Sequence, residues 1–260
     1  MLKLAFVGAG NVAWHLAPAL ESGGALVKGV YSRTAASAQL LAQRLYDTKV
    51  FTSPDFSSLE IDIVFLCVPD EAIGPVAAQL SLPKNCALVH VSGAKPMSVL
   101  QEKVTNPVGV FYPLQTFSKS KKKLKFSDIP ICIEGAKQET LDTLADLAWT
   151  VSRQVYHLSS EERLKLHVAA VISCNFTNHL FALADDFLKD TELDFAFLRP
   201  LIIETVEKAL SHKPAEVQTG PAQRNDESTL NAHEQSLRHH PGIHQVYQFL
   251  TRSIKSYYKK

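Results

Sequence analysis

A glycine-rich turn near the start of the chain constrains the fold more than any other feature. The apolar run 2–7 leads directly into the sequence GAGNVA at residues 8–13, and residues 13–20 then have helical spacing. In a strand–turn–helix of this form, Gly8 permits the tight turn, Gly10 lets a pyrophosphate approach the backbone, and Ala13 lets the helix pack close to the strand. The free N–H groups at the helix start attract the anion. The turn therefore predicts a dinucleotide-binding site that contains Gly8, Gly10, Asn11 and Val12.

Apolar runs alternate with helical segments through the first half of the chain. The runs are apolar on both faces, which is typical of parallel strands covered by helices on both sides. They span residues 2–7, 25–31, 61–68, 87–91, 108–112, 129–134 and 154–158. From about residue 159 only helical patterns occur, over 161–188, 195–211, 226–238 and 243–255. We predict an α/β fold in which a Rossmann-like, doubly wound, mostly parallel sheet (residues 1–155) precedes a smaller all-α domain (residues 156–260).

The residues after the second predicted strand indicate which dinucleotide is bound. An NAD site usually has an acidic residue there that accepts a hydrogen bond from the ribose 2′-OH. This chain has Ser32, Arg33 and Thr34 instead. A guanidinium and two hydroxyls can bind a 2′-phosphate, which a carboxylate would repel. The pattern favours NADP over NAD, with a solvated loop position for Arg33 as the alternative.

Ligands of this architecture bind at the carboxyl ends of the strands. The residues that follow three further predicted strands are therefore candidates for the same site. We expect Val68 and Pro69 to bind the cofactor and the Asp70 backbone to border the nicotinamide ribose, while the Asp70 side chain caps the next helix. Ser92, which Gly93 follows, is expected to face the nicotinamide or the substrate as a catalytic residue. The alternative for Ser92 is a simple Ser-Gly turn. Tyr112 ends the next strand and is a candidate for substrate binding.

Composition and charge exclude several classes of protein. The chain has 260 residues, of which 46% are hydrophobic, and a formal net charge of +1. This is globular composition without an overall field for nucleic acid or an anionic membrane. Four cysteines without a CxxC pair fit a reducing cytoplasm, and no transmembrane helix is expected. Five lysines between Lys119 and Lys125 are expected to form a solvated loop, with a phosphate-attracting flap as the alternative.

Several motifs occur together in one order along almost the whole chain. They are the GxGxxA turn, Ser32-Arg33-Thr34, Val68-Pro69-Asp70, the segment YPLQTF at 112–117, SCNF at 173–176 and TGPAQRND at 219–226. Together they resemble an uncharacterised bacterial family that joins a Rossmann-like domain to a C-terminal helical domain of unknown function. That family is similar to the ketopantoate reductase, pyrroline-5-carboxylate reductase and 6-phosphogluconate dehydrogenase group. The resemblance implies NADP binding and reductase chemistry but no particular substrate.

The chain departs from this family at two positions. The resemblance leads us to expect His where Tyr112 stands and Gly where Asn225 stands. The first departure puts a proton-transfer role at position 112 in doubt, and the second suggests a modified turn.

The helix predicted over 161–188 carries candidate catalytic residues. At 100° per residue, Asn175 and Asn178 fall within about 100° of His167, whereas Lys165 lies roughly 160° away. Related dehydrogenases place a Lys and an Asn on the equivalent helix. Here His167 is the candidate general acid, Asn175 would hydrogen-bond the substrate oxygen, and Asn178 would contact the substrate. The alternative is that these polar groups are satisfied in the helical core or in a subunit interface.

The block from residue 219 to 226 offers a second group of substrate ligands. Arg224 could bind a carboxylate through two parallel hydrogen bonds, and Asp226 could join it or cap the following helix. His233 shares a helix face with Asp226 and is a weaker candidate acid. The His-rich segment 239–244 lacks the Cys or carboxylate spacing of a metal site, so no metal is expected.

These features predict an oxidoreductase that transfers a hydride between NADPH and a carbonyl or imine of a small, carboxylate-bearing metabolite. The rival reading is a non-catalytic NADP(H)-binding sensor or scaffold, which the lack of a clear catalytic Lys favours. A deazaflavin-dependent oxidoreductase is a third reading, although no residue marks such a site. We expect a cytoplasmic homodimer that pairs through the apolar helical domain.

Overall fold

The computed structural model describes residues 1–120 and 124–259, which form two compact units, Met1–Ile172 and Ser173–Lys260. The last strand ends at His157, close to residue 155, where the sequence pattern changes from strands to helices. The division between the units lies later, inside a helix, because the first turns of that helix pack on the sheet. The division into a cofactor domain over 1–155 and a helical domain over 156–260 stays a prediction.

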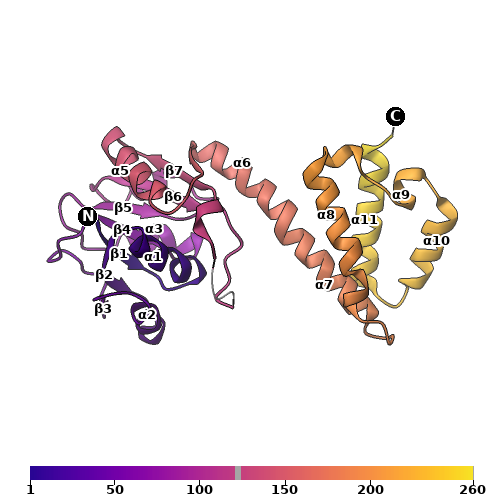
Figure 1. The fold of residues 1–260 in the computed structure, drawn as a ribbon, viewed down its shortest axis with the longest axis horizontal. Helices are drawn as coiled ribbons and strands as arrows, with labels where there is room; N and C mark the ends of the chain where they lie inside the picture. Colours follow the sequence, from indigo (N-terminus) through magenta and orange to yellow (C-terminus); the bar gives the residue numbers. More distant parts are fainter. Residues whose placement is uncertain (121–123, 260) are drawn as a thin grey trace. The chain divides into compact units, whose positions relative to one another are not determined.

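The first unit contains one eight-stranded sheet, which confirms the Rossmann-like fold class (Figure 1). The strands are β1 (Lys3–Val7), β2 (Leu26–Tyr31), β3 (Lys49–Phe51), β4 (Ile63–Leu66), β5 (Ala87–His90), β6 (Val108–Pro113), β7 (Ile131–Gly135) and β8 (Val155–His157). Their order is β3-β2-β1-β4-β5-β6-β7-β8. All neighbouring pairs are parallel except β6 and β7, which are antiparallel. The sequence pattern missed β3, a three-residue strand at the edge.

Helices cover both faces of the sheet. Successive residues of a strand point to opposite sides, so each central strand presents apolar side chains to both faces. Phe6 and Phe65 stack on one face with ring centroids 5.1 Å apart, in a core that includes side chains of α1, α2 and α5. Val7 and Leu66 lie in the core of the other face, with side chains of α3 and α4. The helices are α1 (Asn11–Ser22), α2 (Ala35–Ala42), α3 (Ile73–Ala77), α4 (Ser98–Gln101) and α5 (Gln138–Trp149).

The lysine-rich loop follows β6. Its first lysine, Lys119, lies over the ring of Trp14 in α1, with Nζ 5.1 Å from the ring centroid. Lys125 is exposed and pairs with Asp128 at 3.3 Å. These two positions agree with a solvated loop, and residues 121–123 lie outside the described residues.

A single helix of mixed geometry continues from Ser160 to Leu188. It consists of α6 (Ser160–Ala170), a π-helical segment (Val171–Phe176) and α7 (Thr177–Leu188). A π-helix bonds residue i to i+5, so the count of 100° per residue does not apply through this segment. The arc that the sequence predicts for His167, Asn175 and Asn178 therefore lacks its geometric basis and stays a prediction.

By length and composition this helix could cross a membrane, with a mean hydropathy of 1.3 in its most apolar window. The sequence led us to expect no transmembrane helix, and this helix is a candidate by length and composition only. The finding by itself is weak, because core helices of other proteins meet the same criterion. None of that window is buried.

The second unit contains the remaining helices. They are α7, α8 (Arg199–Ser211), α9 (Pro221–Arg224), α10 (Glu227–Ser236) and α11 (Pro241–Tyr257). The sequence pattern predicted α8, α10 and α11 within a few residues. The short α9 falls between the predicted helices 195–211 and 226–238, and Pro221 occupies the first helical position, which proline tolerates.

Candidate functional site

The glycine turn has the geometry that the sequence predicts for an anion site. Gly8 has φ +97°, and a Cβ there would lie 2.2 Å from the Cys67 carbonyl oxygen, so the fold itself requires glycine. At Gly10 the same oxygen would be 3.9 Å from a Cβ, an ordinary contact. Gly10 is the N-cap of α1 without a side-chain cap, which leaves N–H groups of Asn11 and Val12 available to an anion. The protein does not need glycine at position 10 for packing, which points to a requirement set by a ligand.

The end of β2 carries no acidic side chain. Ser32 is half-buried, while Arg33 and Thr34 are exposed. Arg33 makes no ion pair with any described residue, so its guanidinium is available to a phosphate. Thr34 is the N-cap of α2 and makes no side-chain cap hydrogen bond.

The segment after β4 lies next to the glycine turn. Val68 is half-buried, and its Cγ1 would be 3.2 Å from a Cβ at Gly8. Pro69 precedes a short 3₁₀ helix that begins at Asp70. Asp70 is therefore the first residue of that helix and does not cap it, which corrects the expectation from sequence.

Ser92 is buried and serves the turn after β5. Its Oγ accepts hydrogen bonds from the backbone N–H groups of Ala94 at 3.1 Å and Lys95 at 3.0 Å. Its own N–H donates to Nδ1 of His90 at 3.1 Å. These contacts favour the Ser-Gly turn over a catalytic side chain. The catalytic role of Ser92 stays a prediction.

Tyr112 and His167 form a pair beside this turn. The Tyr112 Oη and His167 Nδ1 are 3.0 Å apart, and the two rings meet edge to face. Burial raises the pKa of Tyr112 to about 12, so its hydroxyl stays protonated at neutral pH and can donate to His167. A Cβ at Gly93 would lie 2.6 Å from His167 Nδ1 and 2.7 Å from Tyr112 Cζ. Glycine at position 93 therefore allows both rings to reach the end of β5.

Sequence reasoning proposed Tyr112 and His167 separately but missed their pairing. It also missed Gly93, Arg163 and Glu134. Arg163 is almost fully buried and pairs with Glu134 of β7. A signal was present, because Arg163 stands one helical turn before His167.

The remaining predicted residues lie in the second unit. Asn175 of the π-helical segment, Asn178 of α7 and Arg224 of α9 are exposed. Asp226 caps α10, because its carboxylate accepts from the Thr229 N–H at 3.1 Å and the Thr229 hydroxyl at 2.8 Å. These hydrogen bonds lower the pKa of Asp226. The capping interpretation of Asp226 is confirmed, and its substrate-binding role stays a prediction.

Asn225 has φ +54°, a left-handed conformation. Asparagine tolerates this conformation better than most residues, which explains how it can stand where the family resemblance leads us to expect glycine.

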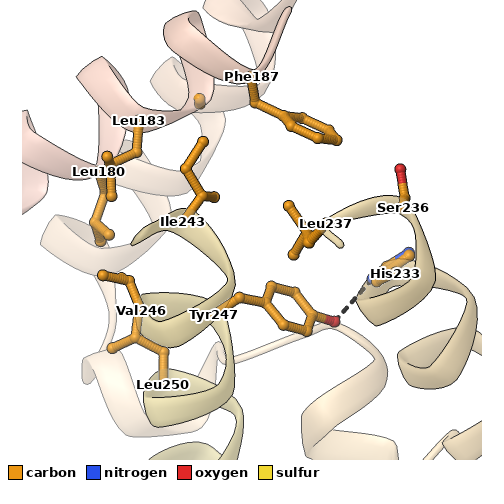
Figure 2. A pocket seen from close by; sticks show the side chains of 11 residues that line it. Leu180, Leu183, Phe187, His233, Ser236, Leu237, Ile243, Val246, Tyr247 and Leu250 are labelled. Atoms are coloured by element: carbon orange, nitrogen blue, oxygen red, sulfur yellow. Dashed lines mark hydrogen bonds between the residues drawn. The ribbon is translucent and has the colours of Figure 1, made fainter. Parts of the chain in front are cut away.

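An apolar cavity of about 370 Å³ lies within the second unit, between α7, α10 and α11 (Figure 2). Leu183, Phe187, Leu237 and Val246 are among its lining residues. The side chain of His233 reaches its edge, where Nδ1 is 2.8 Å from the Tyr247 hydroxyl. This lining offers apolar contacts and little that could polarise a carbonyl group.

Two of the three histidines of segment 239–244 lie near carboxylates. His240 Nε2 is 3.8 Å from Asp190, and His244 Nε2 is 3.5 Å from Glu234. Within the described parts of the chain, no group of three or more His, Cys, Asp or Glu side chains is arranged to hold a metal ion.

Comparisons with known proteins identify both halves of the chain. Residues 1–112 match the model of a Rossmann-like domain, and residues 129–254 match the model of a domain of unknown function (DUF2520). No curated protein matches the chain at a significant level.

Solved structures agree with these matches. A Bacteroides fragilis protein provisionally assigned as an NADP oxidoreductase is 37% identical, with a TM-score of 0.90 and coverage of 98% of both chains. A Thermotoga maritima protein is 24% identical with a TM-score of 0.71, and 98% of each chain is covered. A reductive aminase from Aspergillus terreus, in complex with NADPH and ethyl levulinate, is 14% identical with a TM-score of 0.69. That comparison covers 98% of this chain and 94% of the aminase. The last two similarities concern the fold alone.

The two glycines of the turn should respond differently to the same substitution. Gly8→Ala should lower the free energy of unfolding by more than about 2 kcal/mol, because the methyl meets the Cys67 carbonyl at a positive φ. Gly10→Ala should leave the melting temperature near that of the wild type and weaken NADPH binding at least tenfold, about 1.4 kcal/mol. Thermal melts and calorimetric titration with NADPH measure both effects. Wild-type affinity in Gly10→Ala would contradict an anion site at this turn.

Proposed function

This chain belongs to the family that joins a Rossmann-like domain to the DUF2520 domain, and we propose that it is an NADP-dependent oxidoreductase. It transfers a hydride between NADPH and a carbonyl or imine of a small, carboxylate-bearing metabolite. The observation that carries the proposal is the Tyr112–His167 pair, which lies at the same edge of the sheet as the glycine turn. The glycine turn follows β1 and the pair lies at the end of β6, with β4 and β5 between them along that edge.

NADP is the cofactor that these strand ends suit. The pyrophosphate would bind at Gly8, Gly10 and the start of α1, and Ser32, Arg33 and Thr34 would bind the 2′-phosphate. The NADP-related assignment of the Bacteroides fragilis protein and the NADPH bound to the reductive aminase support this choice. When bound, the cofactor supplies the hydride, so the protein has to orient the substrate and supply a proton.

His167 is the proton donor in this proposal. Its Nδ1 is engaged with the Tyr112 hydroxyl, which leaves Nε2 to face the substrate. Hydride addition to a carbonyl carbon leaves charge on oxygen, and addition to an imine carbon leaves it on nitrogen. A proton from Nε2 of the imidazolium form of His167 neutralises that charge and leaves a neutral ring. The Nδ1–H of that ring donates to the Tyr112 oxygen, which holds the ring in place.

Three residues of the second unit keep the roles proposed from the sequence. Asn175 would donate a hydrogen bond to the oxygen that gains charge, and Asn178 would contact the substrate nearby. Arg224 would bind the substrate carboxylate through its guanidinium.

Replacing His167 tests this chemistry. NADPH consumption should be followed with a panel of 2-keto acids and cyclic imines. For the best substrate, His167→Ala should lower kcat by on the order of 10²- to 10⁴-fold, the usual contribution of a general acid. Lys165→Ala is the matched control, because Lys165 lies on the same helix, is exposed and pairs with Glu161 at 2.7 Å. Equal turnover by wild type and His167→Ala would rule out this role.

A non-catalytic NADP(H)-binding sensor is the second candidate function. It is favoured by the position of Lys165, whose ion pair with Glu161 lies on the exposed side of α6 and provides no catalytic Lys. Tight NADPH binding without turnover of any substrate in the panel would support the sensor.

The 2′-phosphate assignment can be tested at one residue. Arg33→Asp should weaken NADPH binding by at least tenfold while NADH binding changes little, because only NADPH carries the 2′-phosphate that a carboxylate would repel. Fluorescence titration with the two dinucleotides gives both constants. Equal losses for both would remove the assignment.

We also propose that the protein is a homodimer that pairs through its long helix. Leu164, Val168 and Ile172 follow one another at intervals of four residues and are between 42% and 57% exposed. Phe176 and Leu180 continue this spacing, at 58% and 37% exposed. Exposed apolar surface of this extent is typical of an interface.

The homodimer predicts a defined oligomeric state. Light scattering at micromolar concentration should give twice the mass of the 28.7 kDa chain. Val168→Glu should lower that mass toward one chain, because it would place a charge in the interface. A wild-type protein that elutes as a monomer would contradict this proposal.

A further inference from the structure

We propose that Arg163 is a positioning residue that, with Glu134 and Ser160, sets the Tyr112–His167 pair in place. Nothing in the chemistry described above uses these three side chains. The inference rests on the proposed function only in treating the pair as catalytic. The positioning itself concerns contacts within the first unit.

Arg163 lies at the centre of a buried polar node. Its side chain is 1% exposed and forms an ion pair with Glu134 of β7, whose side chain is 18% exposed. Arg163 Nη2 also donates to the Lys95 carbonyl oxygen at 2.7 Å and to Ser160 Oγ at 3.2 Å. One side chain thus joins α6 to a strand and to the loop after β5.

Ser160 completes the node. Its hydroxyl donates to Glu134 Oε2 at 2.8 Å, and its oxygen accepts from the Met97 N–H at 3.0 Å. Glu134 therefore accepts from both Ser160 and Arg163, so its charge is compensated where it is partly removed from water.

The node and His167 occupy the same face of α6. Ser160, Arg163 and His167 are spaced by three and four residues, which places them one above another on a helix. The start of α6 is also fixed by a capping box, in which Ser159 and Glu162 bond each other's backbone N–H groups. A displacement of the node would therefore move His167 along with the helix face that carries it.

The loop on the other side of the pair is equally fixed. His90 accepts from the Ser92 N–H, and Ser92 Oγ accepts from the N–H groups of Ala94 and Lys95. Burial, with the Arg163 charge next in importance, lowers the pKa of His90 to about 3, so its ring is neutral and Nδ1 can accept. The far end of this loop is the part that Arg163 and Ser160 bind, at Lys95 and Met97.

Gly93 lies between these two anchored elements and leaves no free space. Because even a methyl group there would overlap both rings, the distance between loop and helix is set closely. A buried ion pair is poor evidence for stability, since apolar residues of similar volume often stabilise a core better. The value of Arg163 is that its rigid fork bonds three partners at once, which lysine cannot reproduce.

The test compares Arg163→Lys with the wild type, and Lys165→Met serves as the matched control on the exposed side of α6. If Arg163 positions the pair, Arg163→Lys should lower kcat by on the order of 10²-fold, the cost of a small misplacement at a site. KM and the NADPH dissociation constant should change less than threefold. Lys165→Met should leave all three quantities unchanged. A kcat within twofold of the wild type in folded Arg163→Lys would overturn the proposal.

A readout independent of turnover separates this proposal from the proposed function. The ¹⁵N signals of the His167 ring, identified by their loss in His167→Gln, report the hydrogen bond at Nδ1. Arg163→Lys should shift them, and Lys165→Met should not. If no substrate is turned over but these signals shift, the reductase proposal fails and the positioning role stands. If the signals stay in place, the positioning role fails. If Arg163→Lys does not fold, Glu134→Gln takes its place, because it keeps an acceptor for Arg163 and Ser160. The expected changes in kcat and in the His167 ring signals are the same as for Arg163→Lys.

Discussion

The contact between Gly8 and the Cys67 carbonyl determines how the site is built. β1 and β4 are neighbours in the interior of the sheet, and the turn after β1 passes directly over the end of β4. Only a residue without a side chain permits this crossing, which brings α1 close to the sheet edge. The ends of β2, β4, β5 and β6 then lie along that edge, so a dinucleotide bound at the turn would extend toward Tyr112.

Much of the fold could be predicted from local pattern, because buried parallel strands are long apolar runs and the glycine turn has few alternatives. Three features of the fold could not be predicted from local pattern. β3 is short and lies at the edge, so it has no marked apolar pattern, and the π-helical turns at Val171–Phe176 leave no trace in hydrophobic spacing. The division into compact units inside one continuous helix also depends on tertiary packing, which a change of composition cannot locate.

The cofactor side of the site followed from a motif, whereas the reactive side depended on contacts between distant residues. His167 and Tyr112 could be chosen by residue type, but their 3.0 Å contact joins positions 55 residues apart. Gly93 and Arg163 carried no motif, since their importance comes from what packs against them. Ser92 shows the opposite case, because its position suggested a contact with the nicotinamide or substrate, whereas its hydroxyl bonds within the turn after β5.

We propose that one edge of the sheet holds the cofactor and presents its reactive carbon to the Tyr112–His167 pair. A crystal structure of the protein grown with NADP tests this most directly. We expect the pyrophosphate to lie against Gly8 and Gly10, the 2′-phosphate against Arg33, and the nicotinamide C4 to face His167. A dinucleotide bound elsewhere, or a nicotinamide ring directed away from Tyr112 and His167, would contradict it.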